Sequence, residues 1–382
     1  MRKLTMPDSP TITPLFHDCE SPWCFPHLRR SRSGYNAGVN TLRGGHARTI
    51  STGRKIAFAC VMLLIALAWG VSVRAHVTGG DSQHYIHGAE SLAAGLGFIW
   101  PDGTPVTHYP PGYSMFLAVP IALGVATVDA AMLLNGFAFA AMLFLLWRII
   151  DAPWYARIAL VVFCLWPIRG AFMWVLSEGV CFPFMLAALV AANNFVKSRD
   201  NQQLVIAAIC LGVCFLIRHV AGAYIAAACL YLALHRHLLA AVLLGIASSV
   251  PAVTWAIYQR LTVGMLTDRS MVFAPMNAAD AEHFLWQTAS AYVPTWGMSH
   301  VTVAIVTAFL LCVALIWVAM RSRHWMRNAI YPLTMIVYMA LLCVARLWYD
   351  PKIIFDMRTT SPALFLLGLS IVNSVALRPR ST

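Results

Sequence analysis

The sequence has little charge: only 11% of its 382 residues are Asp, Glu, Lys or Arg, whereas 60% are hydrophobic. Soluble globular domains carry about 25% charged residues. This shortage excludes a soluble globular domain. Together with a mean hydropathy of +0.70, it indicates an all-α polytopic membrane protein, because only helices and closed barrels satisfy their own backbone groups in lipid.

Other features are also missing from the sequence. It contains neither a GxGxxG pattern nor a P-loop, so it predicts no nucleotide-binding fold. Eight of its ten cysteines lie in apolar segments, where cysteine behaves as a small hydrophobe, and no disulfide framework is expected. Cys19 and Cys24 lie in a polar tail, at a spacing that fits no standard zinc pattern.

Basic residues outnumber acidic ones by 27 to 15, which gives a formal net charge of +12. The excess gathers in the N-terminal tail and in the loops of one predicted side, as orientation signals do, so no nucleic-acid partner is expected. Residues 1–55 are polar and lack periodicity, and we expect a disordered basic tail in the cytoplasm. Residues 56–382 are expected to form the transmembrane domain.

The apolar run at 113–124 decides the topology, because whether it spans the membrane sets the side on which every later loop lies. It is about a dozen residues long and contains Pro120, whereas a span needs about 20 residues. Treated as a juxtamembrane helix, it leaves Arg148 and Arg157 inside and gives about ten spans in a plasma or inner membrane, with both termini cytoplasmic. The first extracytoplasmic loop is then 74–128 and the second large one 259–299. The expected spans are 56–73, 129–149, 156–167, 178–196, 204–217, one ending before His235, 238–258, one ending before Arg321, 329–345 and 360–377.

The first loop carries the most distinctive pattern of the chain. Gly79 and Gly80 break the preceding helix, and Asp81 opens a new one. Asp81, His84 and Tyr85 share its polar side, so the helix is expected to lie along the membrane surface. Residues 95–97 end it, residues 101–103 form a turn, and the segment at 109–113 begins another helix, with proline tolerated in its first turn.

This pattern resembles the first extracytoplasmic loop of the GT-C glycosyltransferases. That superfamily includes protein O-mannosyltransferases, aminoarabinose transferases and many bacterial polyprenyl-phosphate-sugar transferases. An Asp-x-x-x-Tyr helix is followed by Ala-x-Gly-x-Gly-Phe, a turn and Tyr-Pro-Pro-Gly-Tyr. The matching positions are Asp81, Tyr85, Gly95, Gly97, Phe98 and 109–113.

The resemblance implies a membrane enzyme that moves a sugar from a polyprenyl-phosphate carrier to an acceptor on the outer face. Its partners would be the polyprenyl-phosphate-linked sugar, membrane lipid and an acceptor glycan, lipid or protein. Two other classes stay open: a transporter or flippase of a lipid-linked sugar, and a membrane subunit without chemistry. A transporter would favour broken helices and binding groups near mid-membrane, and a non-catalytic subunit would tolerate replacement of its outer carboxylates.

Asp81 is the candidate catalytic residue. Transfer to a hydroxyl needs a base for the acceptor proton, and a carboxylate can serve; in the GT-C family an aspartate at this position is catalytic. The structural alternative is that Asp81 only caps its helix by accepting from the backbone N–H of His84.

Further candidates for substrate binding are Tyr85, His84, Glu178, Arg218, Arg358 and Tyr113. Glu178 resembles the second acidic position of the family, although an acid at a helix start is also favoured by the dipole. Arg218 and Arg358 lie at the predicted outer boundary, where a guanidinium can bind a donor phosphate or extend to lipid headgroups.

No resident metal or cofactor is assigned from the sequence. Some family members use a divalent cation, and here Asp81 and His84 share a helix face at i, i+3, with His87 nearby. Those three residues are the ones that could bind such a cation.

Overall fold

The computed structural model describes residues 80–264, 329–348 and 357–376, together with a few isolated positions between 273 and 353. All of them belong to the part of the chain from Lys55 to Thr382. The tail at 1–55, the predicted first span at 56–73, the span before Arg321 and most of the predicted loop at 259–299 lie outside the described residues.

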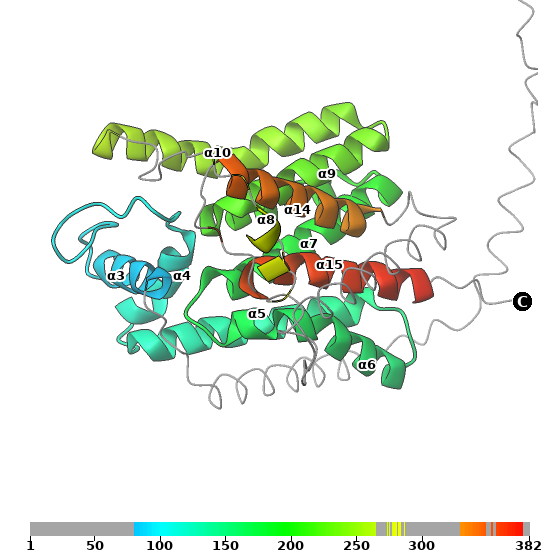
Figure 1. The fold of residues 1–382 in the computed structure, drawn as a ribbon, viewed down its shortest axis with the longest axis horizontal. Helices are drawn as coiled ribbons and strands as arrows, with labels where there is room; N and C mark the ends of the chain where they lie inside the picture. Colours follow the sequence, from blue (N-terminus) through cyan, green and yellow to red (C-terminus); the bar gives the residue numbers. More distant parts are fainter. Residues whose placement is uncertain are drawn as a thin grey trace, which may run out of the picture. The chain divides into compact units, whose positions relative to one another are not determined.

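Helices make up nearly all of the regular structure in this part of the chain (Figure 1). The elements are α3 (Asp81–Ala93), α4 (Gly112–Ala122), α5 (Thr127–Ile149), α6 (Trp154–Leu165), η2 (Trp166–Phe172), α7 (Ser177–Ser198), α8 (Asn201–Ile217), η3 (His219–Ala221), α9 (Gly222–Leu234), α10 (Leu238–Val263), α14 (Ile330–Trp348) and α15 (Met357–Ala376). The described residues pair as strands only at the isolated bridge between Ile99 and Pro105. The all-α fold expected from the sequence is confirmed at this level.

The helix boundaries follow the hydrophobic runs closely. The surface helix starts at Asp81 as predicted, and the segment at 113–124 forms an 11-residue helix, α4. A helix of that length rises only about 17 Å, far less than the hydrocarbon core. The largest difference is at α10, which continues to Val263, five residues beyond its predicted end, because Gln259 and Arg260 extend the helix instead of breaking it.

Five helices in the described part are long and apolar enough to cross a membrane: Thr127–Ile149, Trp154–Phe172, Ser177–Ser198, Leu238–Val263 and Ile330–Leu347. The apolar helices Asn201–Ile217 and His219–Leu234 are shorter. The chain is therefore a multi-pass membrane protein, and the predicted total of about ten spans stays a prediction.

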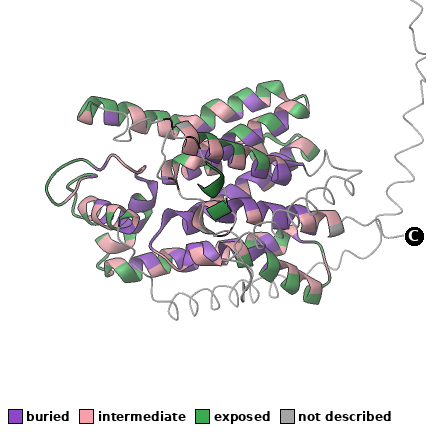
Figure 2. Cartoon of the chain, viewed as in Figure 1, coloured by how far each residue is buried: buried purple, intermediate pink, exposed green. Residues whose placement is uncertain are grey.

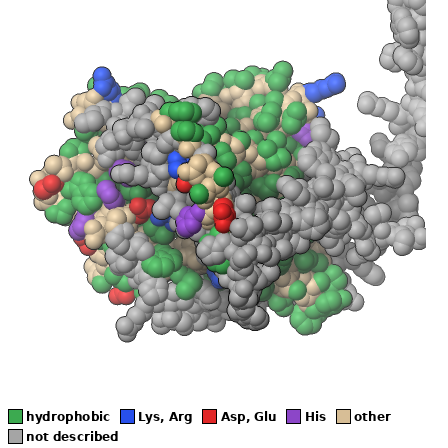
Figure 3. All heavy atoms as spheres, viewed as in Figure 1, with side chains coloured by type: hydrophobic (Ala, Val, Ile, Leu, Met, Phe, Trp, Pro, Cys, Tyr) green, Lys and Arg blue, Asp and Glu red, His purple; other side chains and the backbone are tan. Residues whose placement is uncertain are grey.

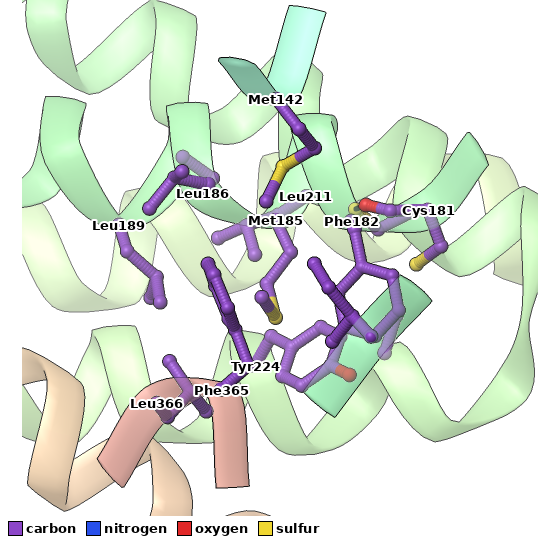
Figure 4. Close-up of a cluster of buried hydrophobic side chains, with 14 of the residues drawn as sticks. Met142, Cys181, Phe182, Met185, Leu186, Leu189, Leu211, Tyr224, Phe365 and Leu366 are labelled. Atoms are coloured by element: carbon purple, nitrogen blue, oxygen red, sulfur yellow. Dashed lines mark hydrogen bonds between the residues drawn. The ribbon is translucent and has the colours of Figure 1, made fainter. Parts of the chain in front are cut away.

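Helix α7 lies at the centre of the packing. In the most apolar 18-residue stretch of each helix, 72% of the residues of α7 are buried but only 17% of those of α10. This contrast is visible in Figure 2. Figure 4 shows Phe182, Met185 and Leu186 of α7 beside Tyr224 of α9 and Phe365 of α15. The apolar side chains left exposed on α10 suit contact with lipid tails, which are as apolar as the core. On the face drawn in Figure 3, charged side chains are few among the described residues.

Two glycines allow close packing, one between the first loop and α8 and one within the loop itself. A Cβ at Gly112, the fourth residue of Tyr-Pro-Pro-Gly-Tyr, would lie 2.5 Å from the carbonyl oxygen of Leu216 in α8. A Cβ at Gly88 would lie 2.3 Å from the ring of Phe98. The side chain of Gln259 also donates to the carbonyl of Thr107 at 3.3 Å. These contacts position α3 against one end of the helices (Figure 1).

Candidate functional site

Asp81 is the first residue of α3, and both of its carboxylate oxygens are engaged. Oδ1 accepts a hydrogen bond from the Tyr109 hydroxyl at 2.5 Å, and Oδ2 accepts one from Nη1 of Arg358 at 2.5 Å. The N-cap position belongs to Gly80, without a side-chain capping bond, and the backbone N–H of His84 donates to the Gly80 carbonyl at 3.3 Å. The capping alternative is therefore wrong: the carboxylate of Asp81 points to other elements and not to its own helix.

Glu178 lies in the first turn of α7 and is only 4% exposed. Its Oε1 forms ion pairs with Nη1 of Arg218 and, at 3.1 Å, with Nε of Arg358. Its Oε2 is buried and has no hydrogen-bond partner among the described residues. Buried carboxylates are usually paired and fully hydrogen-bonded, so this oxygen can accept a bond from a ligand.

The two arginines approach Glu178 from different elements. Arg358 is the second residue of α15, and Arg218 lies in extended backbone between α8 and η3, with φ −150° and ψ 133°. Nη1 of Arg218 also lies 3.5 Å from the hydroxyl of Ser177. The contacts run from Asp81 through Arg358 and Glu178 to Arg218. We call these four residues the charge cluster; its formal charge is zero.

The surroundings of Asp81 favour its ionised form. Burial by itself would raise the pKa of this carboxyl, but the guanidinium of Arg358 and the hydrogen bond from Tyr109 outweigh it, and the pKa lies below its ordinary value. Asp81 is therefore a carboxylate at neutral pH. While it stays bound to Arg358, it is also a weaker base than an unpaired carboxylate would be.

Tyr85 joins the surface helix to the start of α7. Its hydroxyl lies 2.9 Å from that of Ser177, and its ring meets Tyr113 edge to face at a centroid distance of 4.9 Å. Tyr85 is 3% exposed and Tyr113 is fully buried. Tyr85 thus reaches the charge cluster through Ser177, whereas Tyr113 packs behind it in the core, where a substrate could not reach it without rearrangement.

His84 lies on the other side of Tyr109. Its ring is 4.5 Å from Trp100, 5.4 Å from His108 and 5.2 Å from Tyr109, measured between centroids. His87 pairs instead with Glu90, at 3.8 Å. Within the described residues, no three His, Cys, Asp or Glu side chains gather as a metal site would need. The set of Asp81, His84 and His87 is therefore not brought together as a ligand group.

A small cavity of about 10 Å³, with room for about one water molecule, lies beside the charge cluster. Glu178, Arg218 and Arg358 form its polar side. Tyr224 and Tyr338 also line it and stack on each other, with centroids 5.7 Å apart. The remaining lining residues are Cys181, Phe182, Val220 and Pro362. Charged groups thus meet apolar and aromatic side chains at this cavity, which as it stands is too small for a lipid or a sugar.

Sequence reasoning missed four residues of this region: Tyr109 as a partner of Asp81, Ser177, Tyr224 and Tyr338. A signal existed for two of them, because Tyr109 belongs to the Tyr-Pro-Pro-Gly-Tyr motif and Ser177 directly precedes Glu178. Tyr224 and Tyr338 are aromatic residues within apolar helices, and nothing in their local sequence separates them from ordinary core residues.

The fold and the cluster together define a class: a multi-pass helical membrane protein with paired carboxylates and guanidinium groups at one end of its helices. No family model and no curated protein matches the sequence. Among solved structures, the fold is similar to that of ArnT from Cupriavidus metallidurans bound to undecaprenyl phosphate, with a TM-score of 0.54 and 16% identity. The likeness covers 85% of this chain but 60% of ArnT. At this identity it shows the fold alone: the chain has a helical membrane fold similar to that of ArnT.

Proposed function

We propose that this protein is a membrane glycosyltransferase that moves a sugar from a polyprenyl-phosphate donor to an acceptor on the extracytoplasmic face. The observation that carries the proposal is the charge cluster. Asp81, Glu178, Arg218 and Arg358 were each selected from the sequence for this chemistry, and they lie in one continuous network of contacts. The likeness to a protein bound to undecaprenyl phosphate supports the choice of donor.

In this reaction the carboxylates and the arginines have different roles. An acceptor hydroxyl attacks the anomeric carbon and inverts it, while the bond from that carbon to the phosphate oxygen breaks. Asp81 takes the acceptor proton. The departing polyprenyl phosphate gains negative charge, which Arg358 and Arg218 stabilise because guanidinium binds phosphate in a bidentate manner and keeps its charge. Glu178 holds both arginines and offers Oε2 to a hydroxyl of the substrate.

The placement of the charges favours an enzyme over a transporter. Asp81, Glu178 and Arg358 lie in the first turns of α3, α7 and α15, and Arg218 follows the end of α8. A transporter site would be expected near mid-membrane, at interrupted helices. Groups at helix ends meet a donor phosphate at headgroup depth and an acceptor arriving from water.

The test is consumption of a defined donor by the purified protein. A panel of undecaprenyl-phosphate-linked sugars is incubated with the protein in detergent or proteoliposomes, and the release of undecaprenyl phosphate is measured. At least one donor should be consumed, and Arg358→Ala should raise the donor KM more than Arg358→Lys, which keeps the charge but loses the planar fork. If no donor is consumed with any acceptor offered, while the protein moves a lipid-linked sugar between leaflets, the chain is a flippase.

A further inference from the structure

In the described structure the charged groups of the cluster pair with one another. Nη1 of Arg358 donates to Asp81, and Nε lies 3.1 Å from Oε1 of Glu178 without a hydrogen bond among the described residues. A phosphate binds a guanidinium in a bidentate manner along one of two edges, formed by the two Nη groups or by Nε with one Nη. Each edge of Arg358 therefore includes a nitrogen that already lies beside a carboxylate. A phosphate that binds either edge therefore competes with one of the two carboxylates for the guanidinium.

Asp81 is the carboxylate that is more easily displaced from Arg358. Its side chain is 28% exposed, whereas that of Glu178 is only 4% exposed, so water can reach a displaced Asp81 more readily. Leaving a buried carboxylate without its counter-charge is strongly unfavourable. Asp81 also keeps the hydrogen bond from Tyr109 when Arg358 moves away.

We propose that Arg358 holds Asp81 in the resting protein, and that the donor phosphate competes with Asp81 for the guanidinium of Arg358. This inference rests on the proposed function. Binding of the donor then releases the base beside the reacting sugar, so the acceptor proton is taken only after the donor is in place. Removal of the guanidinium also removes a contact that lowers the pKa of Asp81, which makes the released carboxylate a stronger base.

The competition predicts an effect that is unusual for a residue in an active site: loss of the Asp81 charge should tighten binding of the donor phosphate. Undecaprenyl phosphate is titrated into the purified full chain, its Asp81→Asn variant and its Asp102→Asn variant. Asp81→Asn should bind about three- to tenfold more tightly, the range expected when a partly exposed, charge-assisted pair no longer competes. Asp102 is exposed and accepts bonds only from Thr104 among the described residues, so Asp102→Asn should bind as the wild type does.

The double variant Asp81→Asn/Arg358→Ala should lose this gain, because the competing guanidinium is gone. If a folded Asp81→Asn protein binds with unchanged or weaker affinity, the competition is refuted while the proposed function stands. If the wild type does not bind undecaprenyl phosphate, the proposed function fails and the competition fails with it.

A structure of the wild-type protein with undecaprenyl phosphate tests the same exchange without any variant. The phosphate should contact Arg358, and Arg358 should no longer contact Asp81. A bound phosphate that leaves the pair between Arg358 and Asp81 intact would overturn the exchange, even if Asp81→Asn proves too unstable to purify.

Discussion

Asp81 lies between a phenol and a guanidinium, and each affects its basicity. Because Tyr109 donates a hydrogen bond to the charged carboxylate, it contributes to the lowered pKa of Asp81. In the free protein, the acidic limb of kcat/KM should therefore lie below pH 3.8, the ordinary value for aspartate. Stability contributed by this ionised carboxylate is present above its unfolded-state pKa and is lost as the pH falls through the lower folded pKa.

Tyr109→Phe should shift that limb to higher pH, because burial continues to raise the pKa while one opposing contact is lost. The shift is measured from pH profiles of kcat/KM for the variant and the wild type. An acidic limb at the same pH in both proteins would show that the Tyr109 hydroxyl does not act on the Asp81 carboxylate.

Glu178 depends on its two arginines for stability as well as for any role with substrate. Arg218→Ala should reduce the free energy of unfolding by about 3 kcal/mol, because it leaves a buried carboxylate short of counter-charge. The double variant Glu178→Gln/Arg218→Ala should recover part of this loss, since no unpaired charge remains. Thermal unfolding in detergent measures both. A double variant less stable than Arg218→Ala would argue against the ion pair.

At the scale of elements, the close approach of α4 to α8 holds the first loop in place. Gly112→Ala would bring a Cβ within 2.5 Å of a backbone carbonyl that cannot rotate away. We expect a loss of stability of about 1–3 kcal/mol, the usual cost of overpacking, measured as a lower Tm. Gly222→Ala is the matched control, because its Cβ would meet the Phe215 ring only at 3.8 Å. Equal stability of the two variants would contradict the close contact.

The elements were the part of the fold that sequence could predict. Hydrophobic runs and Gly or Pro breaks located α3, α4, α5 and α7 to within a few residues, because both signals are local. The contacts of the side chains were not local. Asp81 and Arg358 are separated by 277 positions in the chain, and no pattern near Asp81 showed that its carboxylate would bind Arg358 instead of capping its own helix.

At the scale of the whole molecule, the orientation of the chain across the membrane is a prediction from its basic loops. Single cysteines at positions 105, 128 and 262 should be labelled by an impermeant reagent from the extracytoplasmic side, and one at 152 only from the cytoplasm. The reason is the 11-residue length of α4, which is too short to cross. Labelling of position 152 from outside would mean that α4 crosses the membrane. The residues of the proposed site would then not all lie on the extracytoplasmic side.

Turnover of Asp81→Asn shows whether Asp81 is the base of a sugar transfer. Asn has nearly the size of Asp but lacks the charge and the proton acceptor. Since Asp81 does not cap α3, the substitution removes no capping hydrogen bond. The donor-dependent rate should fall by roughly 10²–10⁴-fold, the usual contribution of a positioned base, while the folded variant still binds undecaprenyl phosphate. An Asp81→Asn protein that transfers sugar at the wild-type rate would contradict the account.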